Sequence, residues 1–278
     1  MGRVLGLALL LALGGCDIGG SSVEAAPTTS ELRGLPADAQ LVGVAITPSG
    51  TRYVLDRHSG IYRVDAAGAR LVFNTTGLAG LEFTDLVALD DARFAITAEN
   101  DGFLFDLSTG KLSSYFCYLP PPNPGTDGEG SSQPVVPISV SQTLRLAGIA
   151  VSQRTEAVAF NPDTGRLFAQ PRTTRLDTGG IAGSELFVFE PPGSEPVAVL
   201  PLDSGFVATG MAVVGDRLFL GSGSSLWEAA LDGGLTRVGE FASAIDLGGI
   251  ARAPDGTLWL LDAKGRRLVK FDPEIKLW

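Results

Sequence analysis

The stretch GIARAPDGTLWLLD at residues 249–262 indicates the fold of the chain. It reads as a short apolar strand, a tight polar turn and a second apolar strand. The Asp-Gly pair in the turn favours the positive φ that a short hairpin turn requires. The stretch therefore predicts a β-hairpin.

The same strand-turn-strand pattern is present four more times. In each unit the first strand carries alanine in the second place of a three-residue group. A third strand that ends in an acidic residue and a more variable fourth strand follow the hairpin. The five groups are Val44-Ala45-Ile46, Val87-Ala88-Leu89, Val158-Ala159-Phe160, Met211-Ala212-Val213 and Ile250-Ala251-Arg252.

Units of four strands that recur roughly every 40 to 70 residues match the blades of a β-propeller. We predict an all-β fold, a single propeller of four-stranded blades over residues 41–278, with five legible blades. A β-sandwich, the alternative for many short strands, would not repeat one pattern five times. A Pro/Gly-rich insertion at 120–134 is followed by the strand-like segment 135–146, which leaves a degenerate sixth blade open.

A closed ring explains two further features of the sequence. We attribute the recurrent alanine to crowding, because the innermost strands converge on a central channel where larger side chains would collide. We assign Leu277-Trp278, at the end of the chain, to the strand that closes the ring, since closure leaves no open sheet edge.

Two stretches resemble known propeller families. Residues 249–262 resemble one blade of the NHL-repeat and gluconolactonase-like propellers. The segment RTEAVAFNPDTGRLF at 154–168 is more similar to the esterase-like phytase and SdiA-regulated propellers. Many families share this blade pattern, so the resemblance identifies a fold better than an activity.

The N-terminus has the form of a targeting segment. Arg3 precedes an apolar run at 4–13 that is too short to span a bilayer. The run ends in Leu13-Gly14-Gly15-Cys16, which resembles the bacterial lipobox; an ordinary signal peptide with a chance cysteine is the alternative.

The lipobox resemblance implies a lipid anchor. Residues 1–15 are then a signal peptide that is removed, Cys16 is acylated, and residues 16–40 form a flexible tether. We expect an exported protein, anchored by its lipid to the bacterial inner or outer membrane.

The charge of the chain excludes one class of partner. The sequence has 21 basic and 31 acidic residues, a formal net charge of −10. Such a surface repels phosphate backbones, so we expect no nucleic-acid partner.

Cys117 is the only cysteine besides Cys16, so an intramolecular disulfide is not expected once Cys16 is acylated.

We expect a ligand site at the channel mouth, where the loops that enter the inner strands meet the loops between the second and third strands. Asp85 and Glu156 stand at matching places before their inner strands. The candidate residues are Asp56, His58, Asp85, Glu99, Asn100, Asp101 and Glu156.

Carboxylate and amide oxygens suit a hard cation such as calcium, which makes Asp85, Glu99 and Glu156 candidate metal ligands. The gluconolactonase resemblance implies a metal-binding glutamate at Glu156. Thr209 and Gly248 replace the asparagine and aspartate of that family, a departure that counts against a lactonase. The competing interpretation is that these carboxylates cap turns by bonding to their own backbone.

The sequence shows no complete catalytic set. His58 is the only histidine, which excludes zinc clusters and histidine-pair proton relays. We expect a monomeric, non-enzymatic module that binds an envelope protein or a glycan and needs no cofactor. The alternatives are a divalent-metal-dependent hydrolase of the lactonase or phosphoesterase type, and a non-catalytic assembly factor.

Overall fold

The computed structural model describes residues 28–78, 81–98, 101–117, 150–191, 196–203, 205–230, 234–241 and 245–274. Within these ranges the regular elements are twenty strands, β1 to β20, in five four-stranded antiparallel sheets. No helix long and apolar enough to cross a membrane occurs in the described ranges. The all-β prediction is confirmed.

Each sheet is one blade; in blades 1 to 4 the strands run outward from the channel in chain order, whereas in blade 5 the outermost strand is β1. Blade 1 is β2 (Leu41–Ile46), β3 (Arg52–Asp56), β4 (Gly60–Asp65) and β5 (Gly68–Asn74); blade 2 is β6 (Phe83–Ala88), β7 (Arg93–Ala98), β8 (Asp101–Asp106) and β9 (Lys111–Cys117); blade 3 is β10 (Val151–Asn161), β11 (Arg166–Arg175), β12 (Ile181–Phe189) and β13 (Pro196–Pro201); blade 4 is β14 (Gly210–Val214), β15 (Arg217–Ser222), β16 (Ser225–Ala229) and β17 (Leu235–Glu240); blade 5 is β18 (Leu247–Arg252), β19 (Leu258–Asp262), β20 (Arg267–Phe271) and β1 (Thr29–Glu31).

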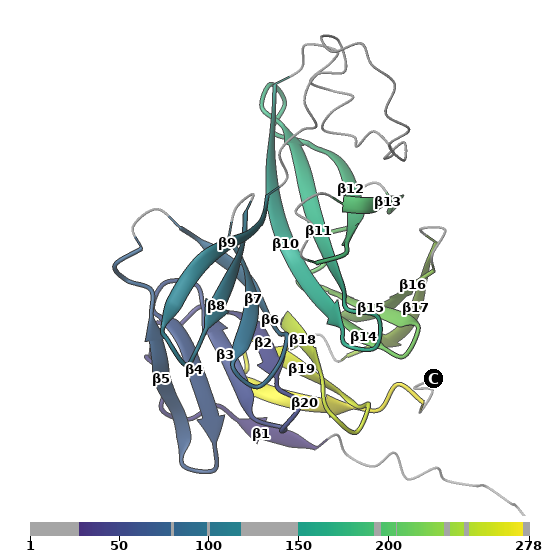
Figure 1. The fold of residues 1–278 in the computed structure, drawn as a ribbon. Helices are drawn as coiled ribbons and strands as arrows, with labels where there is room; N and C mark the ends of the chain where they lie inside the picture. The colour runs from purple at the N-terminus through teal and green to yellow at the C-terminus, as the bar shows by residue number, and fades with distance from the viewer. Residues whose placement is uncertain are drawn as a thin grey trace, which may run out of the picture.

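The blades form a closed ring (Figure 1). The inner strands β2, β6, β10, β14 and β18 contact one another in that order, and β18 contacts β2. The described residues thus contain five blades, as the pattern predicted. The insertion at 120–134 and the segment 135–146 lie outside the described residues.

Apolar packing between blades holds the ring together. Five clusters of buried side chains correspond to the five boundaries between neighbouring blades. Between blades 1 and 2, for example, the rings of Tyr53 and Phe94 meet edge to face at 4.9 Å. The burial of apolar surface at these boundaries is the main force that favours folding.

The N-terminal segment closes the ring. β1 pairs antiparallel with β20, with Ser30 opposite Leu268. Leu32, which follows β1, donates its N–H to the carbonyl of Arg266 at 2.9 Å and is buried in the cluster between blades 5 and 1.

This closure corrects two predictions. The tether was expected over 16–40, but Thr29–Glu31 belongs to blade 5, so the propeller begins before residue 41. The outer position of the last blade, which we assigned to Leu277-Trp278, is taken by β1; residues 275–278 lie outside the described residues. A polar strand of three residues gives no apolar pattern by which the sequence could have placed it.

Neighbouring inner strands approach each other backbone to backbone. A Cβ atom on Gly210 would lie 2.5 Å from the Cα of Gly249. A Cβ on Gly249 would lie 3.1 Å from the Cα of Gly43, and one on Gly43 would lie 2.9 Å from the backbone nitrogen of Leu86. Glycine is required here for close approach, because no side chain fits between the strands.

We expected the recurrent alanines to be small because the inner strands crowd together around the channel. In the structure the crowded side of these residues faces the neighbouring blade. Their side chains face the following blade in four units, and the four residues are Ala45, Ala159, Ala212 and Ala251. In blade 2 the alignment was wrong by one residue. A β-bulge precedes Asp85 as one precedes Gly43, and counting from the bulge makes Val87, not Ala88, the counterpart of Ala45. Val87 packs toward blade 3.

Gly210→Ala should destabilise the protein by about 1–3 kcal/mol, because the added methyl group forces the backbones of β14 and β18 apart. The matched control is Gly77→Ala, where no heavy atom lies within 4 Å of the new Cβ. Equilibrium denaturation of both variants measures the difference. Equal stabilities would show that the inner strands are not in close contact.

Leu32→Ala should cost about 2–4 kcal/mol, because it leaves a cavity in the cluster that joins the N-terminal segment to the ring. Val197→Ala is the control, since Val197 is exposed on the outer strand β13, and it should change stability by no more than about 0.5 kcal/mol. If Leu32→Ala is as mild as this control, the N-terminal segment is not part of the folded ring.

Candidate functional site

The channel has two ends. At the entry end the inner strands begin and the second strands of the blades turn into the third; at the exit end the inner strands finish and turn into the second strands. The residues predicted from the sequence belong to the entry end.

Asp85 ties blade 2 to blade 3. Its side chain is buried; Oδ1 accepts the N–H of Leu86 at 2.8 Å, and Oδ2 accepts the N–H of Val158, on the inner strand of blade 3, at 2.9 Å. Burial raises the pKa of this carboxyl well above its usual value, although both N–H bonds act to lower the pKa. Asp85 thus occupies the position after the bulge that glycine occupies in blades 1 and 5, and its side chain bonds to the backbone there.

Glu156 is held by two arginines. It is the extra residue of the β-bulge in β10, and its carboxylate lies 2.9 Å from Nη2 of Arg172 and 3.8 Å from Nε of Arg154. Arg154 also bonds to Glu82 at 3.3 Å. A cation at Glu156 would therefore meet two positive charges already paired with the same carboxylate.

Asp85 and Glu156 do not occupy matching places. The extra residue of the bulge in β6 is Thr84, so Thr84 is the counterpart of Glu156. The hydroxyl of Thr84 donates to the hydroxyl of Thr97 at 2.8 Å inside blade 2. The sequence alignment missed this shift because a bulge adds one residue without changing the apolar pattern.

Asp56 caps its own turn. It is buried at the end of β3, and Oδ1 accepts the N–H groups of His58 at 3.1 Å and Ser59 at 2.6 Å. Oδ2 accepts the N–H of Gln40, just before β2. These contacts agree with the turn-capping interpretation, and the His58 side chain is exposed to solvent.

The same capping device occurs in blade 5 at a residue that was not among the candidates. Asp262 is buried at the end of β19, accepts the N–H of Gly265 at 2.9 Å and pairs with Nε of Arg267 at 2.9 Å. Asp101 begins β8 opposite Ala98.

The candidate metal site is not assembled in the residues that the structure describes. Those residues hold no group of three or more histidine, cysteine, aspartate or glutamate side chains that could bind a metal ion. Glu99 and Asn100 lie outside the described residues, as does Cys16. The entry end therefore brings Asp85 and Glu156 to neighbouring inner strands and engages each with protein partners.

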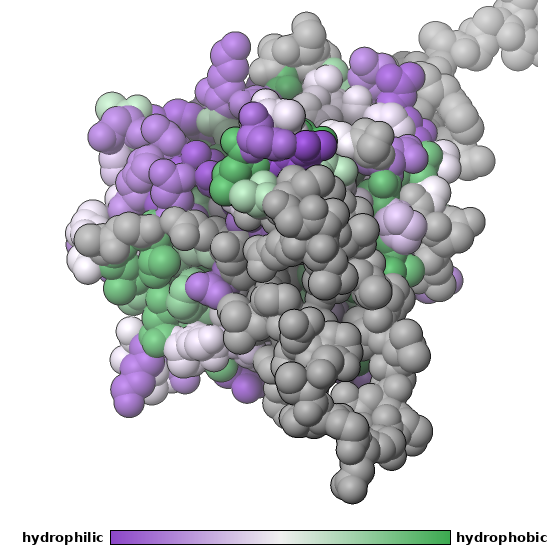
Figure 2. All heavy atoms as spheres, turned by 90° about the horizontal axis from the view of Figure 1, so that it is seen from above, coloured by the Kyte–Doolittle hydropathy of each residue, from purple (hydrophilic) through white to green (hydrophobic). Residues whose placement is uncertain are grey.

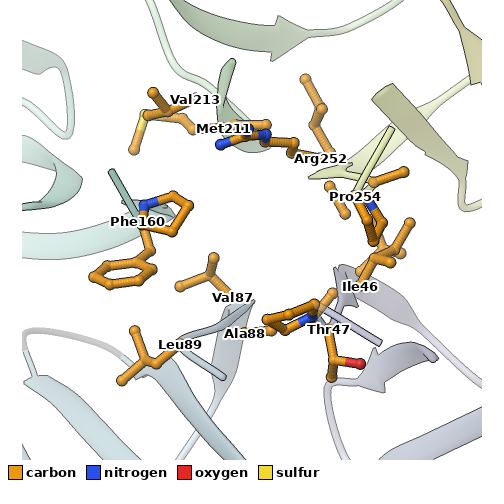
Figure 3. Close-up of a pocket in the computed structure, with 18 residues that line it drawn as sticks. Ile46, Thr47, Val87, Ala88, Leu89, Phe160, Met211, Val213, Arg252 and Pro254 are labelled. Atoms are coloured by element: carbon orange, nitrogen blue, oxygen red, sulfur yellow. The ribbon is translucent and has the colours of Figure 1, made fainter. Parts of the chain in front are cut away.

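A cavity of about 290 Å³ opens at the exit end, and none of the candidate residues lines it (Figure 3). All five inner strands contribute to its wall. The lining side chains are almost all apolar, and they include Ile46, Val87, Leu89, Phe160, Met211 and Val213. Sequence reasoning missed this cavity because its residues belong to strands and turns that signal only the fold.

Arg252 is the one charged residue that lines this cavity. Among the described residues its buried Nη1 atom has no hydrogen-bond partner, and the acidic oxygen that pairs with it is Oδ2 of Asp163 at 3.6 Å. Asp163 lies in blade 3 and Arg252 in blade 5, so this ion pair joins blades that are not neighbours in the ring.

Blade 3 projects beyond the other blades at the entry end (Figure 1). Its strands β10, β11 and β12 have 11, 10 and 9 residues, whereas the strands of the other blades have at most 7. We call the part of blade 3 that extends past the entry end of the other blades, residues 151–155 and 171–184, the blade 3 projection.

The tip of the blade 3 projection exposes apolar side chains. Leu176 is 62% exposed and Ile181 is 44% exposed. On either side of Leu176 in the chain, Arg175 and Asp177 form a salt bridge, with 2.5 Å between Nη2 and Oδ2. Its base is polar and buried: Gln170 bonds to the carbonyl of Phe206 at 3.0 Å and also to the Ser184 hydroxyl. Viewed from the side of the projection, the described surface mixes polar and apolar residues (Figure 2).

The fold and these sites define the protein as a five-bladed β-propeller with a polar entry end, an apolar exit end and one projecting blade. No protein-family model and no curated protein matches the chain. A solved structure titled "Crystal Structure of Mitotic Checkpoint Complex" contains a similar chain, with a TM-score of 0.44 and 12% identity over 97% of this chain and 98% of that chain. The fold assignment rests on the strand pairing described above.

Asp85 gives a pH-dependent test of the entry end. Because its pKa is higher in the folded state than in the unfolded state, its contribution to stability is full below the unfolded value near 3.8 and is lost as pH rises through the folded value. The wild type should therefore lose stability relative to Asp85→Asn as pH rises from 4 to 8, with a slope of at most about 1.4 kcal/mol per pH unit.

Denaturation of both proteins at each pH measures this difference, because all other titrating groups are common to the two. A difference that stays constant across the range, or one that favours the wild type as pH rises, would contradict the buried position of Asp85.

Proposed function

We propose that the protein is an envelope lipoprotein whose propeller binds a protein partner through the blade 3 projection. One observation carries the proposal: the tip of a sheet that extends past the rest of the ring leaves Leu176 and Ile181 exposed. Burial of such side chains against a partner is favourable, at about 25 cal/mol per Å² of apolar surface.

The base of the projection supports a role in recognition because it is held in a fixed shape. Thr173, Ser184 and Glu185 are buried there, and the side-chain oxygen of Gln170 accepts the N–H of Ala208, on the approach to blade 4, at 2.7 Å. A projection that is ordered before it binds loses less conformational entropy on binding.

The lipid anchor is the part of the proposal that the sequence alone supports, through Leu13-Gly14-Gly15-Cys16. With Thr29 already in blade 5, residues 17–28 connect the anchor to the ring. A chain of this length reaches at most roughly 40 Å, so the propeller would stay close to the membrane surface. An envelope partner within that distance fits such a module.

The hydrolase alternative has less support. A metal-dependent hydrolase needs free carboxylates, and those of Asp85 and Glu156 are engaged by backbone N–H groups and by guanidinium groups. The hydrogen bonds of Asp85 and the ion pairs of Glu156 with Arg154 and Arg172 suit a role in holding blades 2 and 3 together.

A photo-crosslinking amino acid at position 176 of the full chain, expressed in bacterial cells, tests the proposal. We expect one discrete protein adduct from position 176, and a several-fold lower yield when Ile181→Ser removes the neighbouring apolar contact. Position 164, exposed in the turn between β10 and β11 at the exit end, is the control. The same adducts from both positions, or none from 176, would contradict the proposed binding surface.

A further inference from the structure

The exit-end cavity has the properties of a small-molecule site. Five inner strands enclose it, and its volume of about 290 Å³ is near the lower limit of ligand pockets, which is about 300 Å³. We propose that it binds a small carboxylic acid with an apolar body, and that Arg252 binds the carboxylate. This site is independent of the blade 3 projection, which lies at the other end of the ring.

The wall of the cavity favours an apolar ligand body. Three of its residues, Pro48, Pro162 and Pro254, follow inner strands and have no N–H to donate. The hydroxyl of Thr47 is already used, because it bonds to the Ser49 hydroxyl at 2.9 Å and accepts the N–H of Thr51 at 3.2 Å. A neutral polar ligand would leave its own polar groups without partners in this wall, which is costly.

Arg252 supplies the complement to a negative charge. A guanidinium carries five N–H donors, and here the buried Nη1 has no hydrogen-bond partner among the described residues. Its acidic neighbour, Asp163, is 63% exposed and too distant, at 3.6 Å, for a hydrogen bond. Nη1 itself is shielded from solvent, but the Arg252 side chain is 29% exposed and lines the cavity, so a ligand carboxylate bonds to the accessible part of the guanidinium.

The location of Arg252 makes the proposal specific. It stands at the last position of β18, and Figure 3 shows it at the edge of the ring of apolar side chains. An acid whose carboxylate bonds to Arg252 therefore has its apolar body over Met211, Val213 and the neighbouring inner strands. A cation, by contrast, would be repelled by the only charge on the wall.

Octanoate is a suitable probe, with octan-1-ol as the neutral compound of the same chain length. Met211 is the only methionine after the predicted signal peptide, so ¹³C labelling of methionine methyl groups places a single reporter in the cavity wall. Octanoate should raise the melting temperature and shift the Met211 signal in a saturable way. Octan-1-ol should bind at least roughly tenfold more weakly.

Arg252→Met keeps most of the apolar stem and removes the charge, so it should weaken octanoate binding by roughly tenfold or more and leave octan-1-ol binding unchanged. Arg70→Met, on the exposed outer strand β5, is the control and should bind octanoate as the wild type does. If Arg252→Met does not fold, Arg252→Lys should fold and bind octanoate with intermediate affinity. Octanoate binding that is equal in the Arg252 variants and the control, or that leaves the Met211 signal unmoved, would overturn the proposal.

Discussion

The structure depends on the close approach of neighbouring inner strands around the channel. At Gly43, Gly210 and Gly249 the backbones of adjacent blades come so near that no side chain fits between them. Between blades 2 and 3, Asp85 takes this place and bonds to the backbone of both blades. The narrow ring that results sets the size of the channel, and the outer strands pack into the wedges between blades.

The two ends of the ring differ because different residue types meet there. The carboxylates of Asp56 and Asp262, at the ends of second strands, and the amide of Gln170, within β11, bind the backbone of entering loops, so the entry end is rich in polar contacts. Proline and aliphatic residues finish the inner strands, so the exit end is an apolar cavity. A protein partner at the blade 3 projection and a small acid at the exit end would therefore bind without competing for the same surface.

The sequence predicted the fold well because each blade carries the same local signal, an apolar strand followed by a turn with aspartate or glycine. It failed where one residue changes the register. The bulge that makes Thr84 extra shifted the second blade by one position, which placed Asp85 where Thr84 belongs. Ring closure by Thr29–Glu31 was missed because that strand is short and polar and its partner β20 lies at the other end of the chain. The site was predicted at the entry end because carboxylates suggest chemistry, whereas the cavity lies among residues that appear in the sequence only as strand ends and turns.

Hydrogen–deuterium exchange of the full chain tests most directly whether the ring is closed by its N-terminal segment. The amides of Ser30 and Leu32 should exchange as slowly as those of β20, because in this register their N–H groups face β20 and its neighbouring residue Arg266. Exchange of the Ser30 and Leu32 amides at the rate of an unstructured chain, while β20 stays protected, would contradict the closed ring.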